Sequence, residues 1–377
     1  MSGNKKKLGI IVNPIAGIGG RVGLKGSDGT ETIERAKELG AVQTAPKRTV
    51  EALKRLIPII DRIQIFSYPH DMGENEVRQC GFEPTVIGKI TKDKTTADDT
   101  KRAAKEMHKL GVDLILFSGG DGTARDIYEA INGKVPALGI PSGVKIHSGV
   151  YAINPASAGD LAASYLRGGP VRLKSSEVMD LDEEAYREDR VSARLYGYLN
   201  TPYEKSLVQG SKEGSTHHEK FILDAIAKDI IDRMENNITY IVGPGSTTLP
   251  ILEKLCLKKT LLGVDAIRNH QLLASDVNES KLLELIKGKK TKIIVTIIGG
   301  QGFIFGRGNQ QISPEVIRLV GKENILIVAT PDKLASLKGR PILVDSGEKE
   351  LDIELNGYFR VITGYGLRSI YKVTAYD

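Results

Sequence analysis

The sequence contains no tryptophan and only two cysteines in 377 residues. Cys80 and Cys256 lie far apart in the chain, which predicts two free thiols rather than a disulfide framework. Neither a CxxC nor an HExxH pattern occurs, and this argues against a structural zinc site. Aromatic residues make up 5% of the chain, so few side chains are available to stack on nucleic-acid bases.

Long apolar runs are also missing. No apolar segment approaches the length of a membrane-spanning helix, and the basic start "MSGNKKKLGIIVNP" has too short an apolar stretch for a signal-peptide core. These absences predict a cytoplasmic protein without a membrane partner. The net charge of +6 suits anionic ligands. Because Lys and Arg are interleaved with Asp and Glu, the charge does not indicate nucleic-acid binding.

Short apolar runs alternate with amphipathic helical patterns along the first part of the chain. This βαβα rhythm predicts an α/β protein whose N-terminal domain is a doubly wound, mostly parallel sheet. A Gly-Gly-Pro break follows a helical pattern at residues 168–170. We therefore predict an N-terminal α/β domain at 1–169 and a C-terminal mixed α/β domain with antiparallel strands at 170–377. Within the latter, we expect a strand "LLGVD" ending at Asp265 and closing strands from Leu351 onward.

The most informative motif is "GGDGT", Gly119 to Thr123, which lies between a buried strand pattern and a helical pattern. Glycines at such a junction let backbone N–H groups approach an anion, and the helix dipole favours the negative charge. The Asp121 carboxylate is unexpected there unless it abstracts a proton, orients a hydroxyl or works beside a metal. The alternative is that Asp121 or Thr123 only caps the helix. The strand–turn–helix setting favours the functional interpretation and indicates phosphoryl transfer.

Several motifs together resemble a known superfamily. "GGDGT", preceded by "IIVNPIAG", resembles NAD kinases, diacylglycerol kinases, sphingosine kinases and relatives of 6-phosphofructokinase. "LFSGGDGTARDI" with "IPSGVKIHSGVYAINP" looks most like the ATP-NAD kinase family, in its AcoX-like branch. The resemblance covers much of the first domain.

The resemblance implies ATP-dependent phosphorylation of a ribose hydroxyl of NAD, which yields NADP-type products. Asp121 would be the base or hydroxyl-orienting group, and Gly119, Gly120, Gly122 and Thr123 would contact ligand phosphate or ribose. Mg²⁺ would be bound mainly through the ATP phosphates. The C-terminal domain would complete the nucleotide cleft, and the protein would be a homo-oligomer, a dimer or a tetramer. The block "IPSGVKIHSG" replaces the usual Ile-Asn-x-Gly turn, which leaves the 2′ and 3′ hydroxyls open as acceptors.

Further candidates follow other strand patterns of the first domain. Asn13 ends the first strand, where it either forms an Asx-type turn or contacts the nucleotide. In the loop after "VPALGI", Lys145 is a candidate to neutralise phosphate and His147 to donate to it. Asn154 precedes a helical pattern, and either caps that helix or holds a ribose hydroxyl.

The second half offers three more strand-end candidates. "GPGSTT", residues 243–248, is a second possible anion cradle with Ser246 and Thr247 as hydroxyl donors, or a simple capped turn. Asp265 is a candidate for ribose hydroxyls, and Arg307 in a Gly-rich loop for phosphate. Asp180 and Asp182 share one strand face, which we interpret as solvated rather than metal-binding, so no metal ligands are predicted.

Two other functions remain open from the sequence. A lipid kinase of the diacylglycerol or sphingosine type is slightly favoured by "NPIAG", but no basic amphipathic helix supports it. A non-catalytic nucleotide-binding regulatory protein would keep the glycines, but simple phosphate binding gains nothing from the Asp121 carboxylate.

Overall fold

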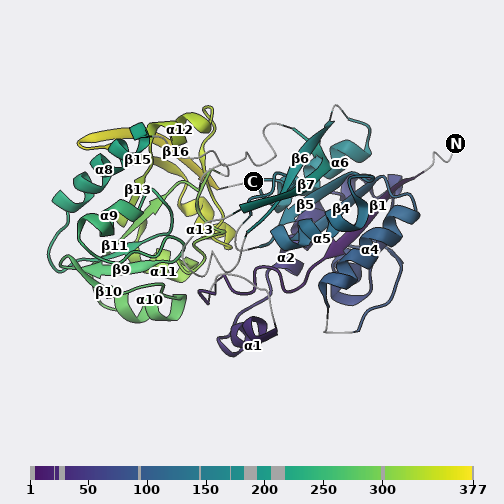
Figure 1. Ribbon diagram of the computed structural model, residues 1–377, viewed down its shortest axis with the longest axis horizontal. Helices are drawn as coiled ribbons and strands as arrows, with labels where there is room; N and C mark the ends of the chain where they lie inside the picture. The colour runs from purple at the N-terminus through teal and green to yellow at the C-terminus, as the bar shows by residue number, and fades with distance from the viewer. Residues whose placement is uncertain are drawn as a thin grey trace. The chain divides into compact units, whose positions relative to one another are not determined.

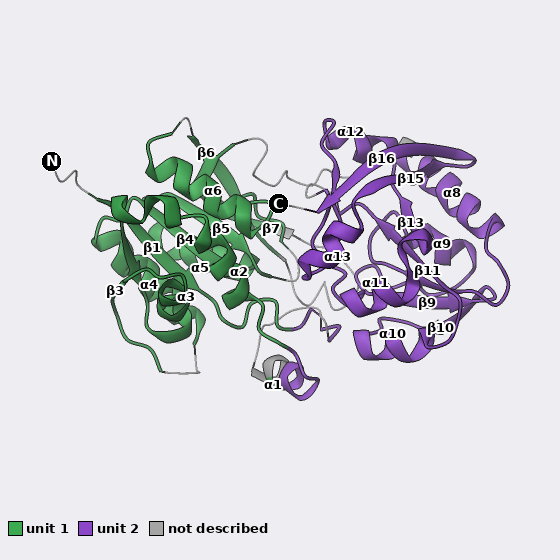
Figure 2. Ribbon diagram, turned by 180° about the vertical axis from the view of Figure 1, so that it is seen from behind, with its two compact units in different colours: residues 1–18, 26–34, 42–211 green, residues 19–25, 35–41, 212–377 purple. Residues whose placement is uncertain are grey.

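The computed structural model describes residues 5–20, 22–24, 30–91, 95–143, 146–169, 171–181, 193–204, 217–298 and 302–375. The chain divides into two compact units (Figure 2). The first comprises residues 1–18, 26–34 and 42–211, and the second comprises residues 19–25, 35–41 and 212–377. The first unit therefore continues beyond residue 169, where the sequence placed the boundary, because the antiparallel hairpin that follows packs onto it.

The first unit is built on a parallel sheet. Its strands are β1 (Lys6–Val12), β2 (Ile63–Ser67), β3 (Thr85–Val86), β4 (Leu114–Gly119) and β5 (Ala137–Pro141). Among the described residues they pair in the order β3-β2-β1-β4-β5, with every neighbouring pair parallel. Figure 1 shows β1, β4 and β5 side by side. Strands β2 and β3 are added on one side of β1, and β4 and β5 on the other side, as in doubly wound folds. Because all these strands are parallel, their carboxyl ends lie at one edge of the sheet. The predicted α/β fold is confirmed.

Helices cover both faces of this sheet. They are α2 (Ala45–Lys54), η1 (Ile57–Arg62), η2 (His70–Met72), α3 (Glu74–Gln79), α4 (Ala97–Lys109), α5 (Asp121–Ile131) and α6 (Pro155–Leu166). Helix α1 (Thr30–Glu38) is divided between the units, with its residues from Arg35 onward in the second. Successive strand residues point to opposite faces. Ile10 of β1 therefore packs in the cluster that includes α2 and α6, whereas Ile11 packs in the cluster that includes α4 and α5.

Local signals explain where the helices begin and end. Thr96 and Asp99 form a capping box at the start of α4, each side chain accepting from the other residue's backbone N–H. Gly111 follows α4 at a φ of 65°, in the left-handed region that favours glycine. Asn154 caps α6, and Pro155 occupies its first turn.

An antiparallel hairpin completes the first unit. Its strands are β6 (Arg172–Leu181) and β7 (Ala193–Tyr203). Val178 and Leu199 are buried in the same cluster as α5, while Tyr198 is 49% exposed. The expected antiparallel strands with one solvated face are confirmed for the described part of this segment.

The second unit has its own mixed sheet. The strands are β8 (Thr239–Val242), β9 (Asp265–Arg268), β10 (Gln271–Ala274), β11 (Thr291–Thr296), β12 (Phe303–Phe305), β13 (Ile325–Val328), β14 (Ile342–Val344), β15 (Gly357–Gly364) and β16 (Leu367–Ala375). In the part of the chain that the structure describes, their order is β10-β9-β8-β11-β13-β15-β16-β14-β12. The neighbours β8, β11, β13 and β15 are parallel, and β15 and β16 form an antiparallel hairpin.

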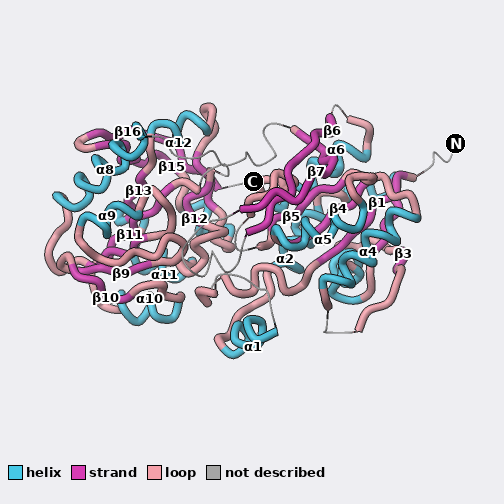
Figure 3. Tube along the Cα trace, in the orientation of Figure 1, coloured by secondary structure: helices cyan, strands magenta, loops and turns pink. Residues whose placement is uncertain are grey.

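Helices flank this sheet as well (Figure 3). They are α8 (His217–Asp232), α9 (Leu249–Lys254), α10 (Glu279–Ile286), α11 (Pro314–Val320), η3 (Lys322–Asn324), α12 (Pro331–Ser336) and α13 (Lys349–Glu354). α8 and α9 contribute to one core cluster, and α10, α11 and α13 to the other. Among the described residues, no helix combines the length and apolar character needed to cross a membrane.

Two expectations for the second half are wrong. The strand expected to end at Asp265 instead begins there, because the preceding residues form a loop whose Thr260 N–H bonds the Asp265 carboxylate. The second expectation is wrong only at its start. Residues 351–354 belong to α13, since Leu351 and Leu355 lie one turn apart and are both buried in the core, whereas β15 and β16 are the expected closing strands.

Candidate functional site

The "GGDGT" turn joins β4 to α5. Gly120 is the N-cap residue and Asp121 is the first residue of the helix, so the helix begins inside the motif. A Cβ atom on Gly119 would lie 2.4 Å from Thr123 Oγ1, and one on Gly120 would lie 3.3 Å from the Cα of Gly143. Glycine at Gly119 and Gly120 therefore permits close packing of the turn, whereas a Cβ on Gly122 would meet open space.

The Asp121 carboxylate does not cap its own helix. Its Oδ2 accepts a hydrogen bond from the His147 backbone N–H at 2.7 Å, and its Oδ1 accepts one from the Ser148 N–H at 3.0 Å. The His147 Nδ1 lies 3.3 Å from the same Oδ2. The Asp121 residue is only 6% exposed. The carboxylate thus fixes the segment after β5 against the turn after β4, and the predicted residues Asp121 and His147 lie together.

Asn13 also reaches the motif. Its Nδ2 donates to the Thr123 Oγ1 at 3.1 Å, and its backbone N–H donates to the Ser118 carbonyl at 2.9 Å. Its Oδ1 accepts from the Ile15 N–H at 3.3 Å, which is the Asx-type turn considered as the alternative. The end of β1 and the start of α5 are therefore joined by side-chain contacts.

Tyr151 also contacts the turn, and the sequence did not predict this residue as part of the site. Its hydroxyl donates to the Gly120 carbonyl at 2.5 Å, and its ring meets that of Phe117 edge-on at 5.4 Å between centroids. A Cβ on Gly139 would lie 2.2 Å from the Tyr151 ring. A glycine inside the buried strand β5 was the available signal, because such a glycine often marks the close approach of another group.

The remaining predicted residues of the first unit differ in their setting. Lys145 lies outside the described residues. The Oδ1 of Asn154 accepts from the Ser157 N–H at 2.8 Å, which supports the capping alternative. The Asn154 Nδ2 is buried and makes no hydrogen bond to any residue that the structure describes. The Oδ1 of Asn154 thus caps the helix, whereas its Nδ2 donates to none of the described residues.

Strand β6 braces the loop that Asp121 holds. The Ser148 hydroxyl donates to the Met179 carbonyl at 2.8 Å and accepts from the Met179 N–H at 2.9 Å. The Asp180 carboxylate accepts from Arg125 Nη1 at 2.6 Å, and Asp182 lies outside the described residues. Among the described residues, no group of three or more His, Cys, Asp or Glu side chains is placed to hold a metal ion.

In the second unit, the "GPGSTT" turn follows β8. Ser246 is exposed, whereas the Thr247 side chain is fully buried. The Thr247 hydroxyl accepts from Lys333 Nζ at 2.6 Å. The Thr248 hydroxyl donates to the Gly243 carbonyl at 2.7 Å, which closes the turn. Lys333 was not among the predicted residues.

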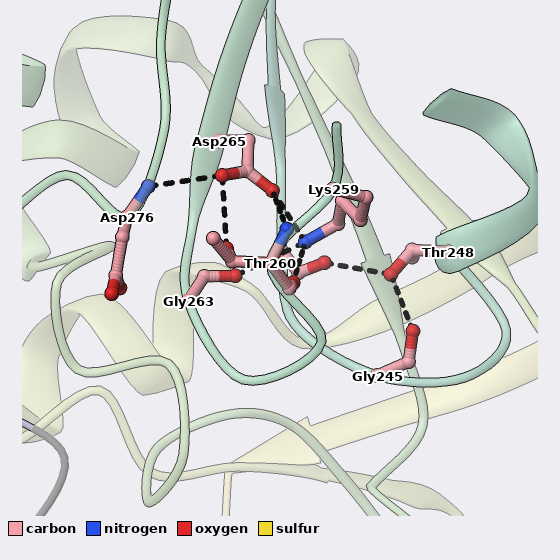
Figure 4. Close-up of polar contacts among 8 residues, drawn as sticks. Gly245, Thr248, Lys259, Thr260, Gly263, Asp265 and Asp276 are labelled. Carbon is pink, nitrogen blue, oxygen red and sulfur yellow. Dashed lines mark hydrogen bonds and ion pairs between the residues drawn. The ribbon is translucent and has the colours of Figure 1, made fainter. Parts of the chain in front are cut away.

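Asp265 lies in a closed polar cluster (Figure 4). Its Oδ2 forms an ion pair with Lys259 Nζ at 2.8 Å, and both side chains have 0% exposure. Its Oδ1 accepts from the Thr260 hydroxyl at 2.9 Å and from the Asp276 N–H at 2.9 Å. This carboxylate anchors two loops, and a ribose could contact it only after those loops had moved.

Arg307 is buried in the loop after β12. That loop is shaped by Asn309, whose Oδ1 accepts from the Gly306 N–H at 3.0 Å and whose Nδ2 donates to the Ile304 carbonyl at 2.8 Å. The Gly-rich sequence there forms a defined turn.

Comparisons with known proteins add a family assignment. The family model described as the ATP-NAD kinase N-terminal domain matches residues 8–169, and the one described as the ATP-NAD kinase C-terminal domain matches residues 235–373. No curated protein matches the chain. A solved structure titled "Crystal structure of UDP-N-acetylglucosamine 2-epimerase" is 11% identical, over 93% of this chain and 77% of that one, with a TM-score of 0.26. A TM-score this low carries no argument.

Proposed function

Because the chain belongs to the ATP-NAD kinase family and is an ATP-dependent NAD kinase-like phosphotransferase, we propose that it transfers the γ-phosphoryl group of ATP to the 2′ or 3′ ribose hydroxyl of NAD. One observation carries the assignment of the reacting residue. The Asp121 carboxylate is fixed by two backbone N–H groups at the carboxyl edge of a parallel sheet. Ligands of open α/β sheets bind at that edge.

Asp121 is the hydroxyl-orienting group or the base in this proposal. A carboxylate oxygen has two acceptor sites, and the Ser148 N–H occupies only one site of Oδ1. The other can accept the ribose hydroxyl. As the new bond forms between that oxygen and the γ-phosphorus, the bond to the β,γ-bridging oxygen breaks, ADP leaves, and the hydroxyl proton passes to Asp121. Since the backbone already fixes the carboxylate, little reorganisation accompanies the reaction.

Donors around the turn would stabilise phosphate charge. We assign this part to the backbone N–H groups of Gly119, Gly120 and Gly122, to the Thr123 hydroxyl that Asn13 orients, and to His147. Lys145 stays a predicted phosphate contact. The buried Nδ2 of Asn154 supports the prediction that this residue also meets a ligand hydroxyl.

Mg²⁺ fits as a partner of ATP. Mg²⁺ keeps several waters and takes few protein ligands, so in this proposal it would be held mainly by phosphate oxygens and water. When bound, the ion neutralises phosphate charge. Ligand contacts by Ser246, Thr247, Asp265 and Arg307, a dimeric or tetrameric state and a cytoplasmic location stay predictions.

The test is a transfer assay with the full chain, ATP, Mg²⁺ and NAD, followed by NMR of the product to identify the phosphorylated oxygen. Failure to form any phosphorylated dinucleotide would contradict the proposed function and would favour the non-catalytic alternative. Within the assay, Asp121→Asn tests the residue assignment, and Asp160→Asn on the partly exposed surface of α6 is the matched control. A fully active Asp121→Asn variant would remove Asp121 from its role.

A further inference from the structure

The loop that holds the Asp121 carboxylate is itself bonded to strand β6. Ser148, whose N–H donates to Asp121 Oδ1 at 3.0 Å, uses its hydroxyl to bond both the carbonyl and the N–H of Met179, at 2.8 and 2.9 Å. The Gly149 N–H donates to the Glu177 carbonyl at 2.9 Å. Three hydrogen bonds therefore join residues 148–149 to β6, so a shift of this strand displaces one of the two donors that fix the carboxylate.

An ion pair leads from β6 back to the helix that Asp121 begins. Arg125 Nη1 donates to the carboxylate of Asp180, the residue after Met179, at 2.6 Å. The Asp180 side chain is 15% exposed and the Arg125 side chain 33%. Arg125 follows Asp121 by four residues in α5, so the two lie one turn apart on the same face of the helix. The contacts thus form a closed ring from Asp121 through Ser148, β6 and Arg125 to Asp121.

The second strand of the hairpin also packs on α5, and Figure 1 shows the hairpin beside this helix. The guanidinium carbon of Arg125 lies 5.6 Å from the centroid of the Tyr196 ring in β7. A Cβ on Gly197 would lie 2.1 Å from the ring of Tyr128, so the backbone of β7 directly contacts a side chain of α5. Arg125 is therefore held between α5 and both strands of the hairpin.

The turn that carries Asp121 depends on such outside support. It contains three glycines, which restrict the backbone least, and a Cβ on Gly122 would meet open space. The two hydrogen bonds that fix the carboxylate both come from the segment after β5. Partly exposed ion pairs contribute little to the stability of a whole domain. The main effect of the Arg125–Asp180 pair is therefore expected to be local, at the loop that β6 holds.

We propose that Arg125 is a positioning residue of the transfer reaction. By pairing with Asp180 it holds β6 against α5, and β6 in turn holds the Ser148 N–H on the Asp121 carboxylate. The proposal rests on the proposed function, because it assigns Arg125 to the placement of the group that takes the ribose proton. A displacement of about 1 Å in a reacting group can lower a rate by about 10²-fold.

The first test compares steady-state kinetics of the full chain with those of Arg125→Met, Asp180→Asn and the double variant. We expect each single change to lower kcat about tenfold and to leave both KM values within about twofold. The double variant should be no slower than the slower single variant, because both residues act through one contact. Arg125→Lys, which keeps the charge but not the planar fork, should recover part of the loss.

Glu129→Gln is the matched control. Glu129 lies on the same helix and forms an ion pair with Lys101 of α4, outside the ring of contacts around Asp121. This variant should keep kcat within about twofold. A kcat of Arg125→Met equal to that of the unaltered chain, or losses that add in the double variant, would overturn the proposal.

A second measurement does not depend on phosphoryl transfer. Hydrogen exchange at the backbone amides of His147 and Ser148 should become about tenfold faster in Arg125→Met, while exchange in β1 and in Glu129→Gln stays unchanged. If the unaltered chain transfers no phosphoryl group, the proposed function fails, and this exchange alone decides whether Arg125 holds the loop. Unchanged exchange at both amides would contradict the proposal whatever the kinetics. Should Arg125→Met not fold, Arg125→Gln replaces it under the same expectations.

Discussion

The two glycine turns of this protein each follow a parallel strand, in separate sheets, and contact groups of opposite charge. "GGDGT" follows β4 in the first sheet, and "GPGSTT" follows β8 in the second. At the first turn, backbone N–H groups hold the Asp121 carboxylate. At the second, a threonine hydroxyl holds the Lys333 ammonium. Two similar strand–turn–helix settings can therefore hold either a carboxylate or an ammonium group, depending on which donors and acceptors the fold brings to them.

Asp121 and Asp265 are two buried carboxylates that the sequence predicts as ligand contacts at strand ends, but their partners differ. Asp121 is held by neutral N–H groups and keeps acceptor capacity. Asp265 faces a fully buried lysine, and its two oxygens also accept from Thr260 and Asp276. We therefore expect substitution of Asp121 to affect turnover and substitution of Asp265 to affect folding.

The largest expected effect is on turnover by Asp121→Asn. In the proposed reaction Asp121 accepts the hydroxyl proton, so its replacement should lower kcat by about 10²- to 10⁴-fold. The asparagine Nδ2 group is a donor and would face one of the two backbone N–H donors. The variant should therefore also lose about 1 kcal/mol in unfolding free energy. Steady-state kinetics and urea denaturation measure the two quantities. Full activity with reduced stability would instead make Asp121 a loop anchor only.

Asp265→Asn should act through stability. The change leaves the Lys259 ammonium buried without its counterion, which typically costs about 3–5 kcal/mol. The double variant Lys259→Met/Asp265→Asn removes both charges and should recover part of that loss, because it leaves no isolated buried charge and the amide oxygen can still accept from the Thr260 and Asp276 donors. Denaturant unfolding of the single and double variants is the measurement. A stable single variant with weakened NAD binding would contradict the division drawn above.

The pH dependence of the first unit should reveal a third buried acid. Glu76 is 3% exposed, and burial raises its pKa from 4.5 to about 7. The folded state therefore binds more protons than the unfolded state between these values, so stability falls as pH rises from 4.5 to 7. The fall amounts to about 3 kcal/mol.

Glu76→Gln should remove most of this slope. Burial also raises the pKa of Asp126 to about 6, and this group should leave a smaller slope of the same sign. Unfolding free energies at several pH values between 4.5 and 8 provide the measurement. A slope unchanged in Glu76→Gln would show that folding does not raise the pKa of Glu76.

The smallest expected effect is that of Tyr151→Phe. The ring still packs on Gly139 and Phe117, but the hydrogen bond to the Gly120 carbonyl is lost. We expect about 1 kcal/mol lower stability and a loss of turnover of about tenfold or less. The exposed Tyr358→Phe is the control, and equal behaviour of the two variants would remove Tyr151 from the support of the turn.

Sequence reasoning reached the first sheet and the neighbourhood of Asp121 because both follow from local patterns. Apolar runs and helix caps depend on residues that are close in the sequence, as at Thr96 and Asp99. The contacts of Tyr151 and Lys333 could not be predicted in this way, since they join segments that only the fold brings together. The strand wrongly assigned before Asp265 shows the same limit, because a buried ion pair outweighed the β-propensity of an apolar run.

The brace between Ser148 and β6 has an evolutionary consequence. Strand β6 lies between the two segments that match the family, yet it bonds the loop fastened to Asp121. Inherited changes in this strand can shift the loop that the Asp121 carboxylate holds without altering any residue of the "GGDGT" motif. Chains that keep an identical "GGDGT" can thus diverge in the geometry around Asp121 through changes in a segment that motif comparison would not include.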